Sequence, residues 1–138
     1  MARIVFCEDD PTIRKLIQLT LRRTIHDISI APDGLAGLAL IERTLPDLVV
    51  TDVSMPGLDG LQLADALAAR PPLAAIPLVV ISAAAQRAQI EEAHHHHRVA
   101  AYLTKPFSPA ALRALIDQLV GDVTSADERR PGDGGDPR

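Results

Sequence analysis

The sequence feature that most constrains the fold is an apolar run that begins at Leu48 and ends on a carboxylate, Asp52. The run is long enough for a buried strand and too short for a helix. Soon after it, Pro56-Gly57 turns the chain sharply. A parallel strand that is buried on both faces has this pattern, and its carboxyl end presents a side chain to a crevice. We therefore predict a buried strand that carries Asp52 to a functional position, since a carboxylate at the tip of a core strand does not serve packing.

Four more apolar runs alternate with segments of helical spacing. The other predicted strands are Arg3–Cys7, His26–Ala31, Leu78–Ile81 and Ala101–Leu103. The predicted helices begin near Asp10, Asp33, Asp59, Ala85 and Ser108, most of which are good helix caps. The last three of these helices are predicted to end near Arg70 (before Pro71-Pro72), His97 and Val120. Strand and helix alternate five times with short connections, which predicts an α/β fold in which helices cover both faces of a parallel sheet.

Composition and charge narrow the class of protein. The chain has 138 residues, which suits one domain with a full core. A net charge of −4 and very few aromatic residues argue against direct binding of nucleic acid. Cys7 is the only cysteine, so no internal disulfide can form, which fits a protein of a reducing compartment. We expect Cys7 itself to be a small, buried, hydrophobic residue. Neither a membrane-spanning apolar stretch nor a signal-peptide pattern is present, so we expect a cytoplasmic protein with no membrane partner.

The C-terminal segment, residues 121–138, differs from the rest of the chain. It is rich in Gly, Asp, Arg and Pro and contains almost nothing apolar. Such a segment cannot bury enough apolar surface to offset the loss of conformational entropy on folding. We therefore predict one domain at residues 1–120, followed by a disordered tail or linker at residues 121–138.

Polar residues stand at the ends of four predicted strands. They are Glu8 and Asp9, Asp52, Ser82, and Lys105. The carboxyl ends of parallel strands meet at one edge of the sheet, and sites in such sheets lie near the point where the strand order reverses. We therefore expect these side chains to converge on a single site.

The residue types in this set favour one chemistry. Carboxylates held close together repel one another unless one is protonated or a cation binds, and oxygen ligands without His or Cys suit Mg²⁺. An ionised Asp is a nucleophile near neutral pH, and phosphoryl transfer mainly needs positioning and charge neutralisation. Lys105 offers a positive charge, while the Ser82 hydroxyl and nearby backbone N–H groups offer donors. The set predicts Mg²⁺-dependent formation of an aspartyl phosphate on Asp52.

From Ala2 to about Val120, the chain resembles the receiver domain of the two-component response regulator family. The matching residues are Glu8-Asp9, Asp52 with Met55-Pro56-Gly57 and Gly60, Ser82-Ala83, and Tyr102 three residues before Lys105-Pro106-Phe107. No single match is specific, but the probability that all of them agree in this order by chance is very small. The resemblance implies a doubly wound, five-stranded parallel sheet of strand order 2-1-3-4-5 with five helices, as in flavodoxin and CheY.

The resemblance also implies roles for the acidic residues. Asp52 would be the phosphoacceptor, and a histidine kinase or a histidine phosphotransfer protein would be the donor. Asp9, Asp52 and the backbone carbonyl of Ser54 would bind Mg²⁺ directly, and Glu8 would act through water. The protein would catalyse only its own phosphorylation and dephosphorylation.

Further roles are implied for the switch. Ser82 and Lys105 would hold the phosphoryl group, Tyr102 would change rotamer with it, and the Lys105–Pro106 peptide bond would be cis. The helix at residues 85–97, the last strand and the last helix would form the face that binds a downstream protein. The chain would act as a monomer or as a phosphorylation-dependent dimer.

Several alternatives remain open at this point. A phosphatase of the haloacid dehalogenase type also uses an Asp after a strand, but it needs a second Asp where this chain has Ser54. A phosphate-independent, receiver-like interaction module is the other alternative. The run His94–His97 departs from the family pattern, and because only two of its members share a helix face we do not predict a metal site there. If the resemblance holds, the chain would be either a stand-alone receiver or a fragment of a larger regulator.

Overall fold

A single parallel sheet of five strands forms the centre of the structure. The structure is a computed structural model that describes residues 2–86, 88 and 99–129, with side-chain burial as far as residue 120. The strands are β1 (Arg3–Cys7), β2 (Asp27–Ala31), β3 (Leu48–Asp52), β4 (Leu78–Ala83) and β5 (Ala101–Lys105). Their spatial order is β2-β1-β3-β4-β5, which confirms the predicted order. The order reverses between β1 and β3, so the carboxyl ends of these strands flank the switch point of the sheet.

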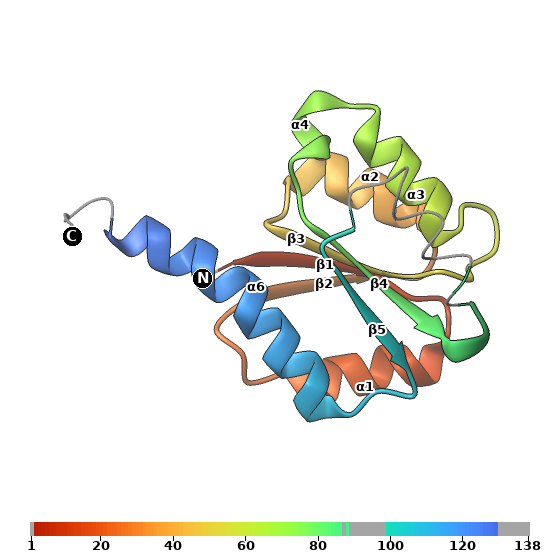
Figure 1. Cartoon of the computed structure of the whole chain (residues 1–138), viewed down its shortest axis with the longest axis horizontal. Helices are drawn as coiled ribbons and strands as arrows, with labels where there is room; N and C mark the ends of the chain where they lie inside the picture. The colour runs from red at the N-terminus through yellow and green to blue at the C-terminus, as the bar shows by residue number, and fades with distance from the viewer. Residues whose placement is uncertain (1, 87, 89–98, 130–138) are drawn as a thin grey trace.

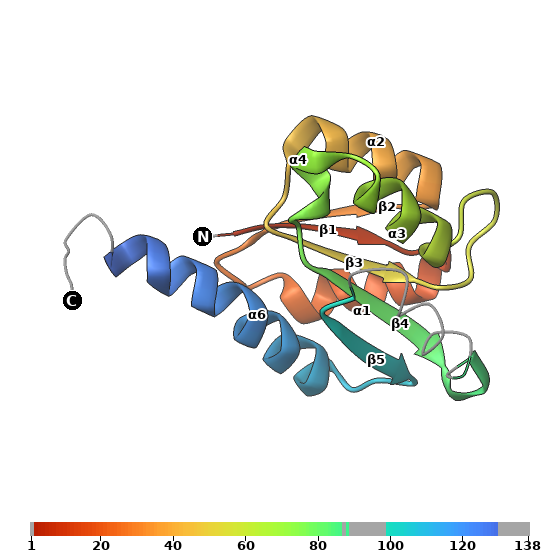
Figure 2. The same ribbon diagram turned by 45° about the horizontal axis from the view of Figure 1, so that its top comes forward.

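Helices cover both faces of this sheet, as Figures 1 and 2 show from two directions. The α-helices whose bounds lie within the described residues are α1 (Pro11–Leu21), α2 (Gly34–Thr44), α3 (Gly60–Ala68), α4 (Pro71–Ala74) and α6 (Pro109–Arg129). One face carries α1 and α6, and the other carries α2, α3 and α4. The doubly wound arrangement that was predicted is therefore confirmed.

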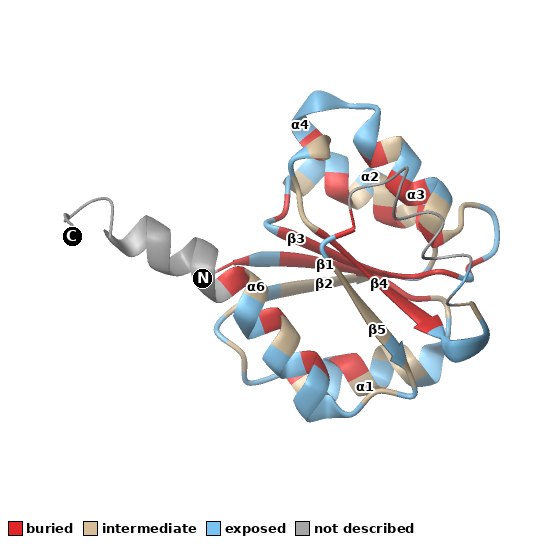
Figure 3. Cartoon of the chain, in the orientation of Figure 1, coloured by how far each residue is buried: buried red, intermediate tan, exposed pale blue. Residues whose placement is uncertain are grey.

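The alternation of side chains along each strand divides the core into two layers. In β1, Val5 packs in the layer under α2 and α3, whereas Phe6 packs in the layer under α1 and α6. Every residue of the central strand β3 is buried, and the edge strands β2 and β5 are less covered, as Figure 3 shows. Cys7 is buried in the first layer, as expected. A buried central strand of this kind fixes the position of Asp52 at its end.

The helix starts follow the local capping signals. The side chains of Asp10, Asp33 and Asp59 each accept a hydrogen bond from a backbone N–H in the first turn of α1, α2 and α3. At α3, the side-chain oxygen of Gln62 accepts a hydrogen bond from the backbone N–H of Asp59, which completes the capping box. These caps satisfy donors that would otherwise lack partners at the helix ends.

Several boundaries differ from the prediction. Helix α3 ends at Ala68, and Pro71 does not merely stop it but begins the short helix α4, since proline is well suited to a first helical turn. Strands β4 and β5 continue to Ala83 and Lys105. The prediction that the last helix ends near Val120 was wrong, because α6 continues to Arg129 past the edge of the sheet (Figure 1). Extending an established helix needs no apolar face, since nucleation is the costly step.

The predicted helix at residues 85–97 lies almost wholly outside the described residues, whose last element before the gap is a 3₁₀ helix at Ala84–Gln86. The division into a domain at residues 1–120 and a tail at residues 121–138 stays a prediction. None of the described helices combines the length and the apolar composition that crossing a membrane requires.

Candidate functional site

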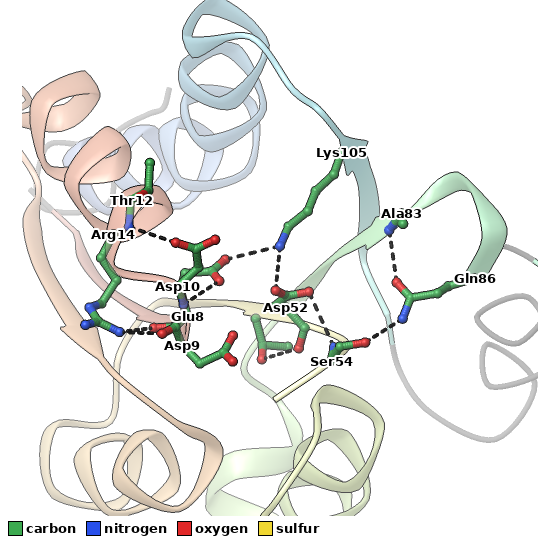
Figure 4. Close-up of polar contacts among 11 residues, drawn as sticks. Glu8, Asp9, Asp10, Thr12, Arg14, Asp52, Ser54, Ala83, Gln86 and Lys105 are labelled. Carbon is green, nitrogen blue, oxygen red and sulfur yellow. Dashed lines mark hydrogen bonds and ion pairs between the residues drawn. The ribbon is translucent and has the colours of Figure 1, made fainter. Parts of the chain in front are cut away.

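The site lies where the carboxyl ends of four strands meet, and Figure 4 shows its polar contacts. Neighbouring strands are paired so that Cys7 lies opposite Thr51, Asp52 opposite Ile81, and Ala83 opposite Lys105. Glu8 follows Cys7 directly, and Ser82 follows Ile81. The register therefore brings the predicted polar residues to one edge of the sheet, as expected from the sequence.

Three carboxylates form the acidic part of the site. Glu8, Asp9 and Asp52 each offer an oxygen within 4.8 Å of the others. Glu8 is 1% exposed and Asp52 is 4% exposed. The Arg14 guanidinium donates to the backbone carbonyl oxygens of Glu8 at 3.1 Å and of Asp9 at 2.9 Å, which anchors the loop after β1 to α1. The strand ends and the Arg14 contacts thus hold the cluster in place.

Lys105 supplies the positive charge. Its Nζ donates to Oδ2 of Asp52 at 2.6 Å and lies 3.6 Å from Oε1 of Glu8. The Lys105–Pro106 peptide bond is cis, the geometry that the family resemblance implies. Burial acts to lower the pKa of Lys105, but the hydrogen bond to Asp52 and the surrounding carboxylates outweigh it and raise that pKa. Lys105 therefore stays charged beside Asp52.

Glu8 is the least satisfied member of the cluster. Its Oε2 accepts from the backbone N–H of Asp10 at 3.1 Å, whereas Oε1 is buried and has no hydrogen-bond partner among the described residues. Burial, together with the nearby charge of Asp52, raises the pKa of the Glu8 carboxyl from 4.5 to about 7. A buried carboxylate oxygen without a donor, beside two other carboxylates, fits a hard cation that takes oxygen ligands. The residues present therefore fit Mg²⁺.

Ser82 and Tyr102, the predicted switch residues, lie on neighbouring strands. The Ser82 side chain is 1% exposed, and its hydroxyl oxygen has no hydrogen-bond partner among the described residues. Tyr102 pairs with Val80 across β4 and β5 and packs against the core layer under α2 and α3. The four-histidine run at residues 94–97 lies outside the described residues.

One residue of the site, Gln86, was not predicted from the sequence. Its Nε2 donates to Oγ of Ser54 at 2.6 Å, and its Oε1 accepts from the backbone N–H of Ala83 at 2.9 Å. The backbone N–H of Ser54 lies 3.4 Å from Oδ1 of Asp52. A pocket of about 440 Å³ beside these groups is lined by Asp9, Val53, Ser54, Met55, Pro56, Asp59 and Gln86. The only signal in the sequence was that Gln86 is the first long polar side chain after β4.

The sequence resembles characterised proteins over most of its length. Residues 4–117 match the family described as the response regulator receiver domain. The chemotaxis protein CheY-3 of Vibrio cholerae is 34% identical over 118 residues, which are 85% of this chain and 90% of that protein. The transcriptional regulatory protein CseB of Streptomyces avermitilis is 33% identical over 117 residues, which are 85% of this chain and 48% of CseB. The chain thus spans about half the length of the first curated relatives that it matches.

Solved structures share the fold. The receiver domain of the Francisella response regulator 1452 superimposes on this chain with a TM-score of 0.79 at 28% sequence identity. The alignment covers 89% of this chain and 99% of that domain. The receiver domain of the sensor histidine kinase PA1611 from Pseudomonas aeruginosa PAO1 is described with a magnesium ion coordinated in its active site cleft. It has a TM-score of 0.77 at 25% identity and covers 87% of this chain and 98% of that domain. From the family match, the strand order and these relatives, the chain belongs to the response regulator receiver domain family of two-component phosphorelay signalling.

Proposed function

We propose that the chain is a phosphorylation-controlled switch in which Asp52 accepts a phosphoryl group from the phosphohistidine of a histidine kinase or a histidine phosphotransfer protein. Receiver domains act as signalling switches rather than as conventional enzymes. The observation that carries the proposal is the environment of Asp52. This residue is buried at the end of the central strand, beside two other carboxylates, and its Oδ2 lies 2.6 Å from Nζ of Lys105. The two chemical partners of a phosphoryl group, a nucleophile and a cation, are thus already in contact.

In the proposed transfer, a carboxylate oxygen of Asp52 attacks the phosphorus atom. The new O–P bond forms as the P–N bond of the phosphohistidine breaks, and the leaving imidazole nitrogen keeps the electron pair and takes a proton. Lys105 would move from the Asp52 carboxylate to the phosphoryl oxygens, where charge accumulates. The Ser82 hydroxyl, buried and without a hydrogen-bond partner among the described residues, would then find one in a phosphoryl oxygen.

A divalent cation would complete the site. Asp9, Asp52 and the backbone carbonyl of Ser54 would hold Mg²⁺ directly, and Glu8 would act through water. When bound, Mg²⁺ neutralises negative charge on the phosphoryl oxygens and on the carboxylates. The same residues would serve hydrolysis of the aspartyl phosphate, so that the protein would catalyse only its own phosphorylation and dephosphorylation.

The output would be a change in protein binding. Moving an equilibrium from 1:99 to 99:1 takes about 5.5 kcal/mol of differential interaction, and hydrogen bonds to a charged group contribute about 1.5–3 kcal/mol each. Ser82 and a backbone N–H next to it could supply most of this. Tyr102 would change rotamer with them, and the face formed by residues 85–97, β5 and α6 would bind the downstream protein.

Intact-mass measurement after incubation with Mg²⁺ and acetyl phosphate tests the proposal. The wild type should gain one phosphoryl group, and Asp52→Asn should gain none. A matched control is Asp27→Asn, which removes an exposed carboxylate at the amino end of β2, on the edge of the sheet away from the site. This variant should be phosphorylated like the wild type. EDTA present during the incubation should prevent formation of the adduct. A wild type that stays unmodified would favour a phosphate-independent interaction module, and continuous release of phosphate from unrelated phosphate esters would favour a phosphatase.

A further inference from the structure

The side chain of Gln86 joins two segments that flank Asp52. Its amide oxygen accepts the backbone N–H of Ala83 at 2.9 Å, at the end of β4. Its amide nitrogen donates to the Ser54 hydroxyl at 2.6 Å, in the loop that follows β3. Figure 4 shows Gln86 on the side of Asp52 that faces away from Glu8 and Asp9. Gln86 is therefore held by hydrogen bonds at both the oxygen and the nitrogen of its amide, within the site but outside the acidic cluster.

The N–H of Ala83 is the donor for which two acceptors compete. It follows Ser82 directly in the chain, and β4 places Ser82 one residue beyond Ile81, the partner of Asp52 in the register. Under the proposed function, a phosphoryl group on Asp52 draws on the Ser82 hydroxyl and on the backbone N–H beside it. A backbone N–H makes one good hydrogen bond at a time. The phosphoryl group can therefore take this donor only if Gln86 releases it.

We propose that Gln86 is a latch, a positioning residue that holds the Ala83 N–H in the unphosphorylated state and must let go when the phosphoryl group binds. The inference rests on the proposed function and adds a residue to its control. The hydrogen bond to Ser54 strengthens the latch, because it restricts the long Gln86 side chain to the rotamer that reaches Ala83 and so lowers the entropic cost of the second bond.

The latch sets the balance between the two states. A neutral intramolecular hydrogen bond is only slightly more favourable in free energy than the hydrogen bond to water that replaces it. Its net contribution corresponds to about a two- to tenfold change in an equilibrium constant. Removing the Gln86 side chain leaves the Ala83 N–H bonded to water in the free protein, from which it is released more easily. Affinity for a phosphoryl-like ligand should therefore rise by about two- to tenfold.

The test compares binding of beryllofluoride, a phosphoryl mimic, in the presence of Mg²⁺ to the wild type and to Gln86→Ala, by isothermal titration calorimetry. Gln18→Ala, which removes an exposed glutamine from α1, is the matched control. A second readout is the exchange rate of the Ala83 amide hydrogen in the ligand-free proteins, measured by NMR. This rate reports on the latch directly and does not depend on any ligand.

The latch predicts that Gln86→Ala binds beryllofluoride about two- to tenfold more tightly than the wild type and exchanges its Ala83 amide hydrogen faster by a similar factor. Gln18→Ala should match the wild type in both. Equal or weaker beryllofluoride binding by Gln86→Ala would overturn the latch, since a residue that only supports the loop or contacts the ligand would weaken binding when removed. If the wild type itself bound no beryllofluoride, the proposed function would fail instead.

Discussion

Replacing Glu8 by glutamine should stabilise the metal-free protein at pH 8 and have little effect on its stability at pH 5. Glu8 is 1% exposed, and burial together with the charge of Asp52 raises the pKa of its carboxyl from 4.5 to about 7. At pH 8 the folded protein therefore carries a buried, ionised carboxylate beside a second one. Glutamine has the same shape, stays neutral, and keeps an oxygen that can accept the N–H of Asp10, so it removes this cost.

The sign and size of the effect follow from proton linkage. The unfolded chain releases the Glu8 proton near pH 4.5, and the folded protein holds it until about pH 7. The stability that this proton confers is complete below pH 4.5 and is lost as the pH rises through 7. A pKa difference of this size corresponds to about 3 kcal/mol at about 1.4 kcal/mol per pKa unit. Loss of the contact between Glu8 and Lys105 offsets part of this, so we expect a gain of about 1–3 kcal/mol at pH 8.

Urea unfolding followed by far-ultraviolet circular dichroism, in EDTA at pH 5 and pH 8, measures the difference. The chain has no Trp and one Tyr, which makes fluorescence a poor probe. Glu42→Gln is the matched control, because Glu42 lies on α2 and is a half-exposed ion-pair partner of Arg70. Loss of this ion pair should change the free energy of unfolding by about 0.5 kcal/mol or less at either pH. Equal stability of Glu8→Gln and wild type at pH 8, or an equal gain at both pH values, would refute the reasoning.

Three further substitutions test other parts of the account. Asp59→Ala removes the capping box of α3 and should lower the free energy of unfolding by about 1 kcal/mol in urea titrations, so an unchanged midpoint would count against it. Gly60→Ala places a Cβ atom in steric conflict with the backbone oxygen of Asp52, so the backbone must move and the free energy of unfolding should fall by about 1–3 kcal/mol in the same assay. Stability equal to that of the wild type would show that the turn adapts freely. Ser82→Ala should still gain a phosphoryl group by mass but lose most of the phosphorylation-dependent increase in affinity for its downstream protein, and an affinity equal to that of the phosphorylated wild type would contradict this.

The sequence was sufficient for the fold because its signals are local and agree with one another. The buried run at β3 has no polar face, which is typical of a central parallel strand, and Asp10, Asp33 and Asp59 are caps that act within their own first turns. Once strands and helices alternate, the carboxyl ends of the strands must share an edge, which is why Asp52 and Lys105 could be placed together. The spatial order of the strands depended on the family resemblance, since no local pattern encodes it.

The features that were missed depend on context rather than on local pattern. Nothing in the residues around Gln86 shows that its side chain also contacts Ser54, because that hydrogen bond joins residues 32 positions apart in the sequence. The raised pKa of Glu8 arises from how completely the surrounding core excludes water. The extension of α6 depends on the packed helix before it, whereas the composition of that segment by itself indicates disorder.

The most direct test of the central claim is to identify the residue that carries the phosphoryl group. The protein would be incubated with Mg²⁺ and acetyl phosphate, treated with borohydride to reduce the acyl phosphate, and mapped by peptide mass spectrometry. The account predicts homoserine in place of Asp52 and unmodified Glu8 and Asp9. Reduction at another carboxylate, or at none, would contradict the assignment of Asp52 as the phosphoacceptor.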